Sequence, residues 1–115
     1  MRILFPRKSQ RRFMKTSIQS RIKEWHYKTF GATTSELGQA MIHKLSEEYV
    51  EVMKAFNNAE PKEKIGEELA DILIVCYGLA SRMDIDLDQM VEEKFEIVKM
   101  RTDQISRDIQ RGIPC

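Results

Sequence analysis

Acidic residues recur in two short segments of the chain at the spacing of an α-helical turn. The first segment contains Glu47, Glu48 and Glu51, and the second contains Glu68 and Asp71. Residues three apart share one face of a helix, so each segment places two carboxylates side by side. Two carboxylates about 4 Å apart repel each other by roughly 4 kcal/mol at an effective dielectric near 20. Acids in this arrangement need a proton, a basic partner or a metal ion.

The same two segments carry the apolar periodicity of amphipathic helices. The first apolar stripe consists of Met41, Leu45 and Val52, and the second consists of Ile65, Leu69, Ile72 and Cys76. Glu48 and Glu68 fall within these stripes, and Glu51 and Asp71 flank them. Hard cations such as Mg²⁺ and Mn²⁺ prefer oxygen ligands. The sequence therefore predicts a Mg²⁺ site, in which Mn²⁺ can substitute, between two antiparallel helices.

A third segment places two basic residues within an apolar stripe. Lys94 and Arg101 lie two helical turns apart, and their apolar neighbours on the stripe are Leu87, Val91, Val98 and Ile105. One interpretation is internal salt bridges or long side chains that reach back to water. The other is a polyphosphate pocket, because arginine offers a planar fork to phosphate oxygens and lysine a point charge. We favour the second interpretation, since metal-bound carboxylates have little charge left to share.

Three aromatic residues gather further upstream, at Trp25, His26 and Phe30. Such residues usually pack in a core, but here they could also stack against a nucleobase. His26 and His43 are the only histidines, and neither forms a Glu-x-x-His pair with the acids. A carboxylate-bridged di-iron bundle would use that pair, so this class of site is not expected.

Helix-boundary signals divide the chain into four predicted helices. The first covers residues 17–30, with Ser17 as its cap, and the second runs from a capping-box signature at residues 33–36 to about residue 56. The third runs from Pro61 to about residue 83, and the fourth from Leu87 past Arg101, with Asp86 as its cap. No useful period-2 alternation appears, so we predict an all-α bundle of four to five antiparallel helices.

Composition sets the limits of this helical domain. At 115 residues and a net charge of +1, the chain fits one domain with no global demand for a nucleic acid or membrane partner. Residues 1–16 contain six basic and no acidic residues and read as a solvated basic arm, residues 17–107 form the helical domain, and residues 108–115 form a tail. No apolar run approaches a membrane span, so we expect a cytoplasmic protein. Cys76 and Cys115 form no metal or disulfide pattern.

These residues resemble the MazG-like branch of the all-α nucleoside triphosphate pyrophosphatases. The family motif, Glu-Glu-x-x-Glu followed after a spacer by Glu-x-x-Asp, reads here Glu47-Glu48-x-x-Glu51 and Glu68-x-x-Asp71. The later Lys94 and Arg101 are similar to the family's last helix, and the resemblance covers about residues 18–102. Val98 stands where many relatives have asparagine one turn after the lysine, so a polar contact of those relatives is missing here.

The resemblance implies a Mg²⁺-dependent hydrolysis of (deoxy)nucleoside triphosphates to monophosphate and pyrophosphate, a clearing of surplus or non-standard nucleotides. It implies metal ligation by Glu48, Glu51, Glu68 and Asp71. It also implies homodimers or homotetramers in which a neighbouring subunit can complete the pocket. Glu48 would serve catalysis through the metal. Glu47 would orient the attacking water, or else be a solvent-facing glutamate.

Two alternatives stay open at this stage. The first is a phosphoribosyl-ATP pyrophosphatase, a related activity that would use the same kind of metal site on a related fold. The second is a non-enzymatic helical module for oligomerisation or nucleic-acid binding, which would use the basic arm at residues 1–16. The second alternative leaves the inward-facing acids without a role.

Overall fold

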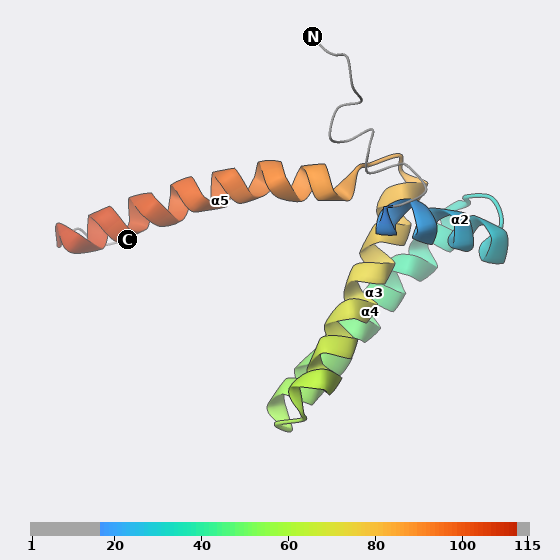
Figure 1. The fold of residues 1–115 in the computed structure, drawn as a ribbon, viewed down its shortest axis with the longest axis horizontal. Helices are drawn as coiled ribbons and strands as arrows, with labels where there is room; N and C mark the ends of the chain where they lie inside the picture. Colours follow the sequence, from blue (N-terminus) through green and yellow to red (C-terminus); the bar gives the residue numbers. More distant parts are fainter. Residues whose placement is uncertain (1–16, 113–115) are drawn as a thin grey trace, which may run out of the picture.

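The computed structural model describes residues 17–112, which fold into four α-helices without any strand in that range. The helices are α2 (Ile18–Phe30), α3 (Ser35–Asn57), α4 (Lys62–Arg82) and α5 (Leu87–Gln110). α3 and α4 form an antiparallel hairpin, α2 lies across its open end, and α5 projects away from it (Figure 1). The all-α prediction is confirmed, whereas the predicted basic arm at residues 1–16 lies outside the described residues.

Most predicted helix ends are found at the expected residues. The Ser17 hydroxyl accepts a hydrogen bond from the Ser20 amide at 3.0 Å and caps α2. The Asp86 carboxylate accepts one from the Gln89 amide at 3.2 Å and caps α5. Gly31 ends α2 with a φ of +76°, a backbone conformation that L side chains rarely adopt.

The predicted position of the cap at the start of α3 is wrong by one residue. Thr34, not Thr33, is the cap, and its hydroxyl accepts a hydrogen bond from the Leu37 amide at 3.1 Å. Glu36 therefore does not close the reciprocal pair that the pattern predicted. Thr33 is left to bond elsewhere: its hydroxyl lies 3.2 Å from the Tyr27 hydroxyl and 3.3 Å from an Arg82 nitrogen.

α2, α3 and α4 meet at Gly78. A Cβ at this position would lie 3.3 Å from the Met41 methyl group on α3 and 3.3 Å from the His26 ring on α2. Gly78 and Met41 are buried, as are Ile22, Ala55 and Ala80. The α4 stripe is less complete than predicted, because Leu69 remains 49% exposed. Small and flexible side chains thus build the core that holds the three helices together.

A buried glutamine fixes the start of α5. The Gln19 side chain on α2 donates to the Ile85 carbonyl at 2.7 Å and accepts from the Leu87 amide at 3.0 Å. The Tyr77 hydroxyl on α4 donates to the Asp88 carboxylate at 2.6 Å. The two Gln19 bonds pair backbone groups at the start of α5, and the Tyr77 bond ties its first turn to α4.

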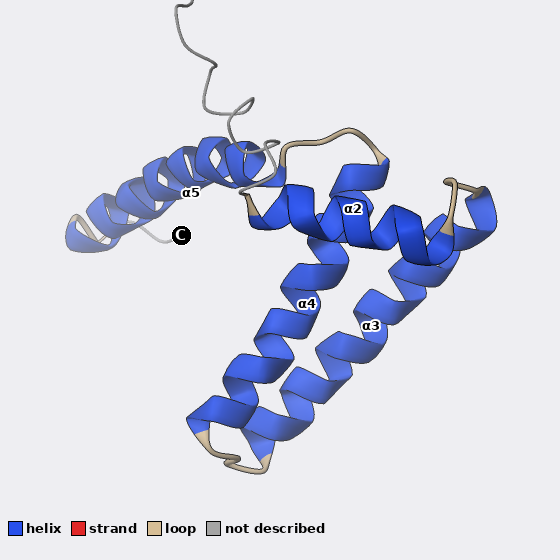
Figure 2. Cartoon of the chain, turned by 45° about the vertical axis from the view of Figure 1, so that its right-hand side comes forward, coloured by secondary structure: helices blue, strands red, loops and turns tan. Residues whose placement is uncertain are grey.

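Beyond this junction α5 extends away from the hairpin, and none of its residues is buried (Figure 2). Its exposed large apolar residues are Met90, Val91, Phe95, Ile97, Val98, Met100, Ile105 and Ile109. Apolar surface gathered along one helix in this way marks an interaction site in soluble proteins. Within residues 17–112, no helix is long and apolar enough to cross a membrane.

Candidate active site

Three acidic side chains converge on the inner face of the α3–α4 hairpin. Glu48 comes from α3, and Glu68 and Asp71 come from one face of α4. Each offers a carboxylate oxygen, and these oxygens lie within 4.8 Å of one another. Glu48 is 8% exposed and Glu68 7%, whereas Asp71 is exposed at the rim. The antiparallel packing therefore brings acids 20 residues or more apart in the sequence to one point.

The two buried carboxylates each hold a lysine one turn earlier on the same helix. The Lys44 ammonium lies 3.2 Å from Glu48 Oε1, and the Lys64 ammonium lies 2.9 Å from Glu68 Oε1. In each case the hydrogen bond to the glutamate, followed by its charge, raises the pKa of the lysine. Both lysines are exposed, so the pairs counter the buried negative charge but leave it accessible from solvent.

The sequence interpretation missed these two lysines. Only its less favoured alternative paired the acids with basic residues, and it named Lys94 and Arg101. The observed partners precede Glu48 and Glu68 by four residues. Opposite charges at this spacing face each other on a helix. The i, i+4 pattern was therefore the signal in the sequence that could have identified them.

The donor set fits a hard divalent cation. All three converging groups are carboxylates, the ligands that Mg²⁺ and Mn²⁺ prefer. Partial burial, followed by the charges of Glu48 and Glu68, raises the pKa of Asp71. After desolvation, the negative charges of Glu48 and Glu68 contribute to this direction, as expected for carboxylates that repel one another at close range. A cation among the three carboxylates would relieve that repulsion. The cluster can therefore hold a divalent metal ion.

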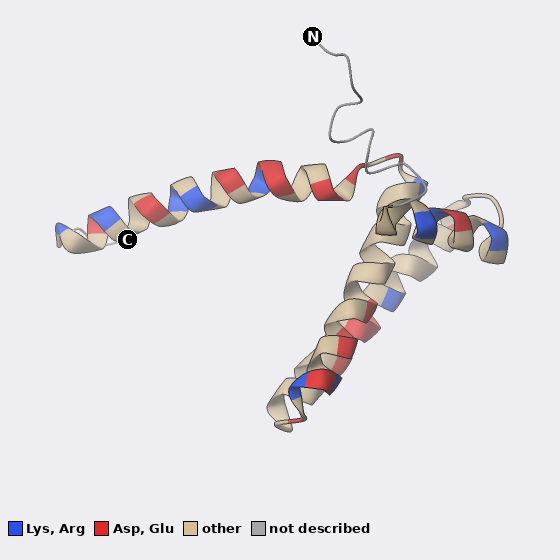
Figure 3. Cartoon of the chain, in the orientation of Figure 1, with Lys and Arg blue, Asp and Glu red and all other residues tan. Residues whose placement is uncertain are grey.

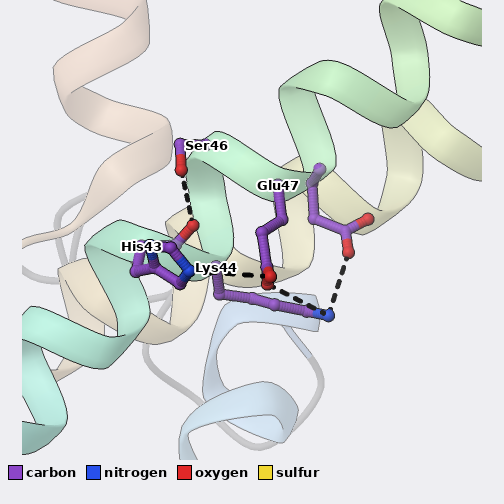
Figure 4. A network of polar contacts seen from close by, with 5 residues as sticks. His43, Lys44, Ser46 and Glu47 are labelled. Carbon is purple, nitrogen blue, oxygen red and sulfur yellow. Dashed lines mark hydrogen bonds and ion pairs between the residues drawn. The ribbon is translucent and has the colours of Figure 1, made fainter.

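Glu51 and Glu47 lie outside this group. The Glu51 carboxylate is 3.9 Å from the Lys54 ammonium, with its side chain half exposed. The Glu47 carboxylate is 3.6 Å from the His43 ring and 4.0 Å from the Lys44 ammonium on the outer side of α3 (Figure 4). The structure thus brings three of the four predicted ligands together. The roles of Glu51 in metal binding and of Glu47 in catalysis stay predictions.

A pocket of about 520 Å³ adjoins the carboxylates between α2, α3 and α4. Its lining includes Glu48, Asp71 and Lys44 together with the aromatic cluster of Trp25, His26 and Phe30. The His26 and Phe30 ring centroids are 4.6 Å apart. Trp25 is 51% exposed and Phe30 52%, so these two rings are not core residues. The aromatic cluster and two of the converging carboxylates thus line the same pocket.

Lys94 and Arg101 do not reach the carboxylates within this chain. Both lie exposed on α5, roughly 10 Å and 21 Å along the helix axis from its start at 1.5 Å per residue. Both signs of charge occur on the α3–α4 hairpin and along α5 (Figure 3). The predicted phosphate-binding pair is therefore separated from the predicted metal ligands in one copy of the molecule.

Comparison with protein-family sequence profiles matches residues 28–110 to the MazG-like family. The chain belongs to the MazG-like family. The match includes the three converging carboxylates of this MazG-like protein, and its membership indicates a nucleotide pyrophosphatase-type activity in general. Trp25 and His26 lie just before the matched region. Comparison with curated proteins and comparison with solved structures each gave no match.

Proposed function

We propose that this MazG-like protein hydrolyses (deoxy)nucleoside triphosphates to nucleoside monophosphate and pyrophosphate, with Mg²⁺ or Mn²⁺ as its cofactor. The observation that carries the proposal is the single pocket that Glu48 and Asp71 line together with the aromatic cluster of Trp25, His26 and Phe30. A nucleotide has the matching polarity, since its metal-binding phosphates and its flat, largely apolar base lie at opposite ends.

The carboxylates Glu48, Glu68 and Asp71 would hold the metal ion. When bound, a divalent cation at such a site supplies Lewis-acid polarisation of a phosphoryl group and lowers the pKa of a coordinated water. The chain's own contribution is to fix the three oxygens on two packed helices. Glu47 would orient the attacking water as a base or an outer-sphere ligand; in this structure its carboxylate lies outside the converging cluster, near His43 and Lys44. The exposed rings of Trp25 and Phe30 would cover one face of the base.

Lys44 would provide a phosphate contact in the same pocket. Its ammonium group pairs with Glu48, and its side chain lines the same pocket. A metal ion at Glu48 would compete with this ion pair, since both depend on the negative charge of the carboxylate. The lysine would then be available to triphosphate oxygens as a point charge.

The proposal includes a homo-oligomer in which a second copy covers α5. This helix exposes an apolar stripe along its length, and the hairpin exposes Tyr49, Met53 and Phe56 on α3 and Leu73 on α4. Packing these surfaces together would remove both from water. Such packing would also bring Lys94 and Arg101 of one copy towards the carboxylates of another. Homodimer and homotetramer both satisfy this requirement.

A hydrolysis panel tests the activity. Purified protein with Mg²⁺ should release pyrophosphate from at least one nucleoside triphosphate, and Glu48→Gln and Asp71→Asn should each remove that release. Glu63→Gln, at an exposed acid in the first turn of α4, is the matched control and should leave the rate unchanged. Phosphoribosyl-ATP belongs in the panel, because a preference for it would replace the proposed substrate class. No pyrophosphate release from any substrate with Mg²⁺ or Mn²⁺ would refute the proposal.

A further inference from the structure

The last turn of α4 carries Arg82, which joins the pocket residue His26 to Tyr27 and to the Gly31 turn. The Arg82 guanidinium places Nε at 3.0 Å and one terminal nitrogen at 2.7 Å from Nδ1 of His26. The same terminal nitrogen donates to the His26 carbonyl at 3.1 Å. The other terminal nitrogen donates to the Gly31 carbonyl at 2.6 Å. The guanidinium carbon also lies 4.0 Å from the centre of the Tyr27 ring.

This arrangement determines which nitrogen of His26 carries the proton. A guanidinium only donates hydrogen bonds and stays charged in proteins, so its partner Nδ1 must present a lone pair. The proton of the neutral ring is then on Nε2. Burial of the ring, followed by the positive charge of Arg82, lowers the pKa of His26 and keeps the ring neutral near pH 7.

The Nε2 atom is the ring nitrogen of His26 that Arg82 does not contact, in a residue that is 8% exposed. It has no hydrogen-bond partner among the described residues, and Asp86 Oδ2 is the one fully buried side-chain polar atom in residues 17–112 that lacks a partner. Nε2 is therefore not sealed in the core. The ring edge that carries it rests over Gly78, next to the pocket residue Met41. His26 itself lines the pocket and packs on Phe30.

We propose that Arg82 is a positioning residue that holds His26 as the Nε2–H tautomer, so that the ring donates a hydrogen bond to an acceptor atom of the nucleobase. The same guanidinium holds the Gly31 turn and thereby sets Phe30 beside the ring. The inference deepens the proposed nucleotide hydrolysis and rests on it. The group that the donor recognises is a carbonyl oxygen or an unprotonated ring nitrogen at the edge of the base.

The tautomer can be measured without any nucleotide. Long-range ¹H–¹⁵N spectra of the free protein at pH 7.5 should show His26 with its proton on Nε2 alone. Arg21→Lys, an exposed arginine on α2, is the matched control and should give the same spectrum. Arg82→Met should give a mixture of tautomers. A wild-type spectrum with the proton on Nδ1 would overturn the assignment, whether or not the Arg82 variant folds.

The base contact is tested by comparing a nucleotide with inorganic tripolyphosphate, which has no base. Arg82→Lys keeps the charge but loses the planar fork, and it should raise KM for the best nucleotide about tenfold, as expected for one lost hydrogen bond. Its kcat should change less than the KM, and binding of tripolyphosphate should be unchanged. His26→Gln, which retains an N–H donor, should recover part of the affinity lost in His26→Met.

The outcomes separate this inference from the proposed function. Equal losses on the nucleotide and on tripolyphosphate would show that Arg82 is only structural and would overturn the base contact. A protein with the Nε2–H tautomer that hydrolyses no nucleotide would refute the proposed function and leave the arginine–histidine assignment standing.

Discussion

The α3–α4 hairpin buries charged side chains, whereas helix α5 exposes apolar ones. The hairpin takes Glu48 and Glu68 out of water, although charged groups are almost never fully buried without a partner. α5 leaves Val91, Phe95 and Val98 exposed. One copy of the chain therefore brings the hairpin carboxylates together. The apolar side chains of α5, by contrast, remain exposed in the described part of the same copy. We therefore expect the proposed metal site to lie within a single chain, and the proposed phosphate contacts of Lys94 and Arg101 to depend on a second copy.

The largest expected effect comes from placing a charge in the apolar face of α5. Phe95→Glu should weaken self-association roughly a hundredfold or more, because an unpaired charge in an interface costs several kcal/mol. Light scattering after gel filtration should show a smaller species, and nucleotide hydrolysis should fall with it. Thr102→Glu adds the same charge at a polar position of the helix and should change neither. An oligomer that survives Phe95→Glu would break the contrast between the two regions.

A smaller and opposite pair of effects is expected at Lys44. Lys44→Met removes the positive charge beside Glu48 and should tighten Mg²⁺ binding. The same change should weaken binding of the nucleoside triphosphate. Calorimetric titrations with Mg²⁺ alone and with tripolyphosphate measure the two effects separately. Weaker binding of both ligands would show that Lys44 holds the site in shape and does not exchange partners.

The smallest effect is a pH dependence centred on α2. Because the pKa of His26 is lowered from its usual 6.5, the unfolded chain takes up a proton below pH 6.5 that the folded chain does not. Folding stability from this group is therefore present above pH 6.5 and lost as the pH falls through the lowered value. The thermal midpoint should drop between pH 7.5 and 5.5, and it should drop less in His26→Gln. Equal drops in both proteins would place the titrating group elsewhere.

Local rules in the sequence predicted most helix starts and the inward direction of two acids on the hairpin. The caps Ser17 and Asp86 follow from side chains that satisfy free amides at helix starts, which is a property of a few neighbouring residues. The inward direction of Glu48 and Glu68 follows from helical periodicity alone. The α3 cap was misplaced because Thr33 and Thr34 are chemically equivalent locally, and the contact of Thr33 with Arg82 depends on the tertiary fold.

The direction of α5 could not be predicted from the same rules. The stripe that contains Lys94 and Arg101 shows that one face of the helix is apolar, but periodicity does not say which surface covers it. The bonds of Gln19 to Ile85 and Leu87 set the angle at which α5 leaves, and these groups are more than 60 residues apart in the sequence. The contact between Arg82 and His26 could not be predicted either, because no local sequence pattern relates the two residues.

The most direct test is a calorimetric titration of Mg²⁺ into the wild-type protein, Glu48→Gln and the control Glu63→Gln. The account predicts measurable binding to the wild type and the control, and its loss in Glu48→Gln, whose helical content should be unchanged by circular dichroism. Equal binding to all three proteins, or no binding to any, would contradict the claim that these carboxylates form a metal site.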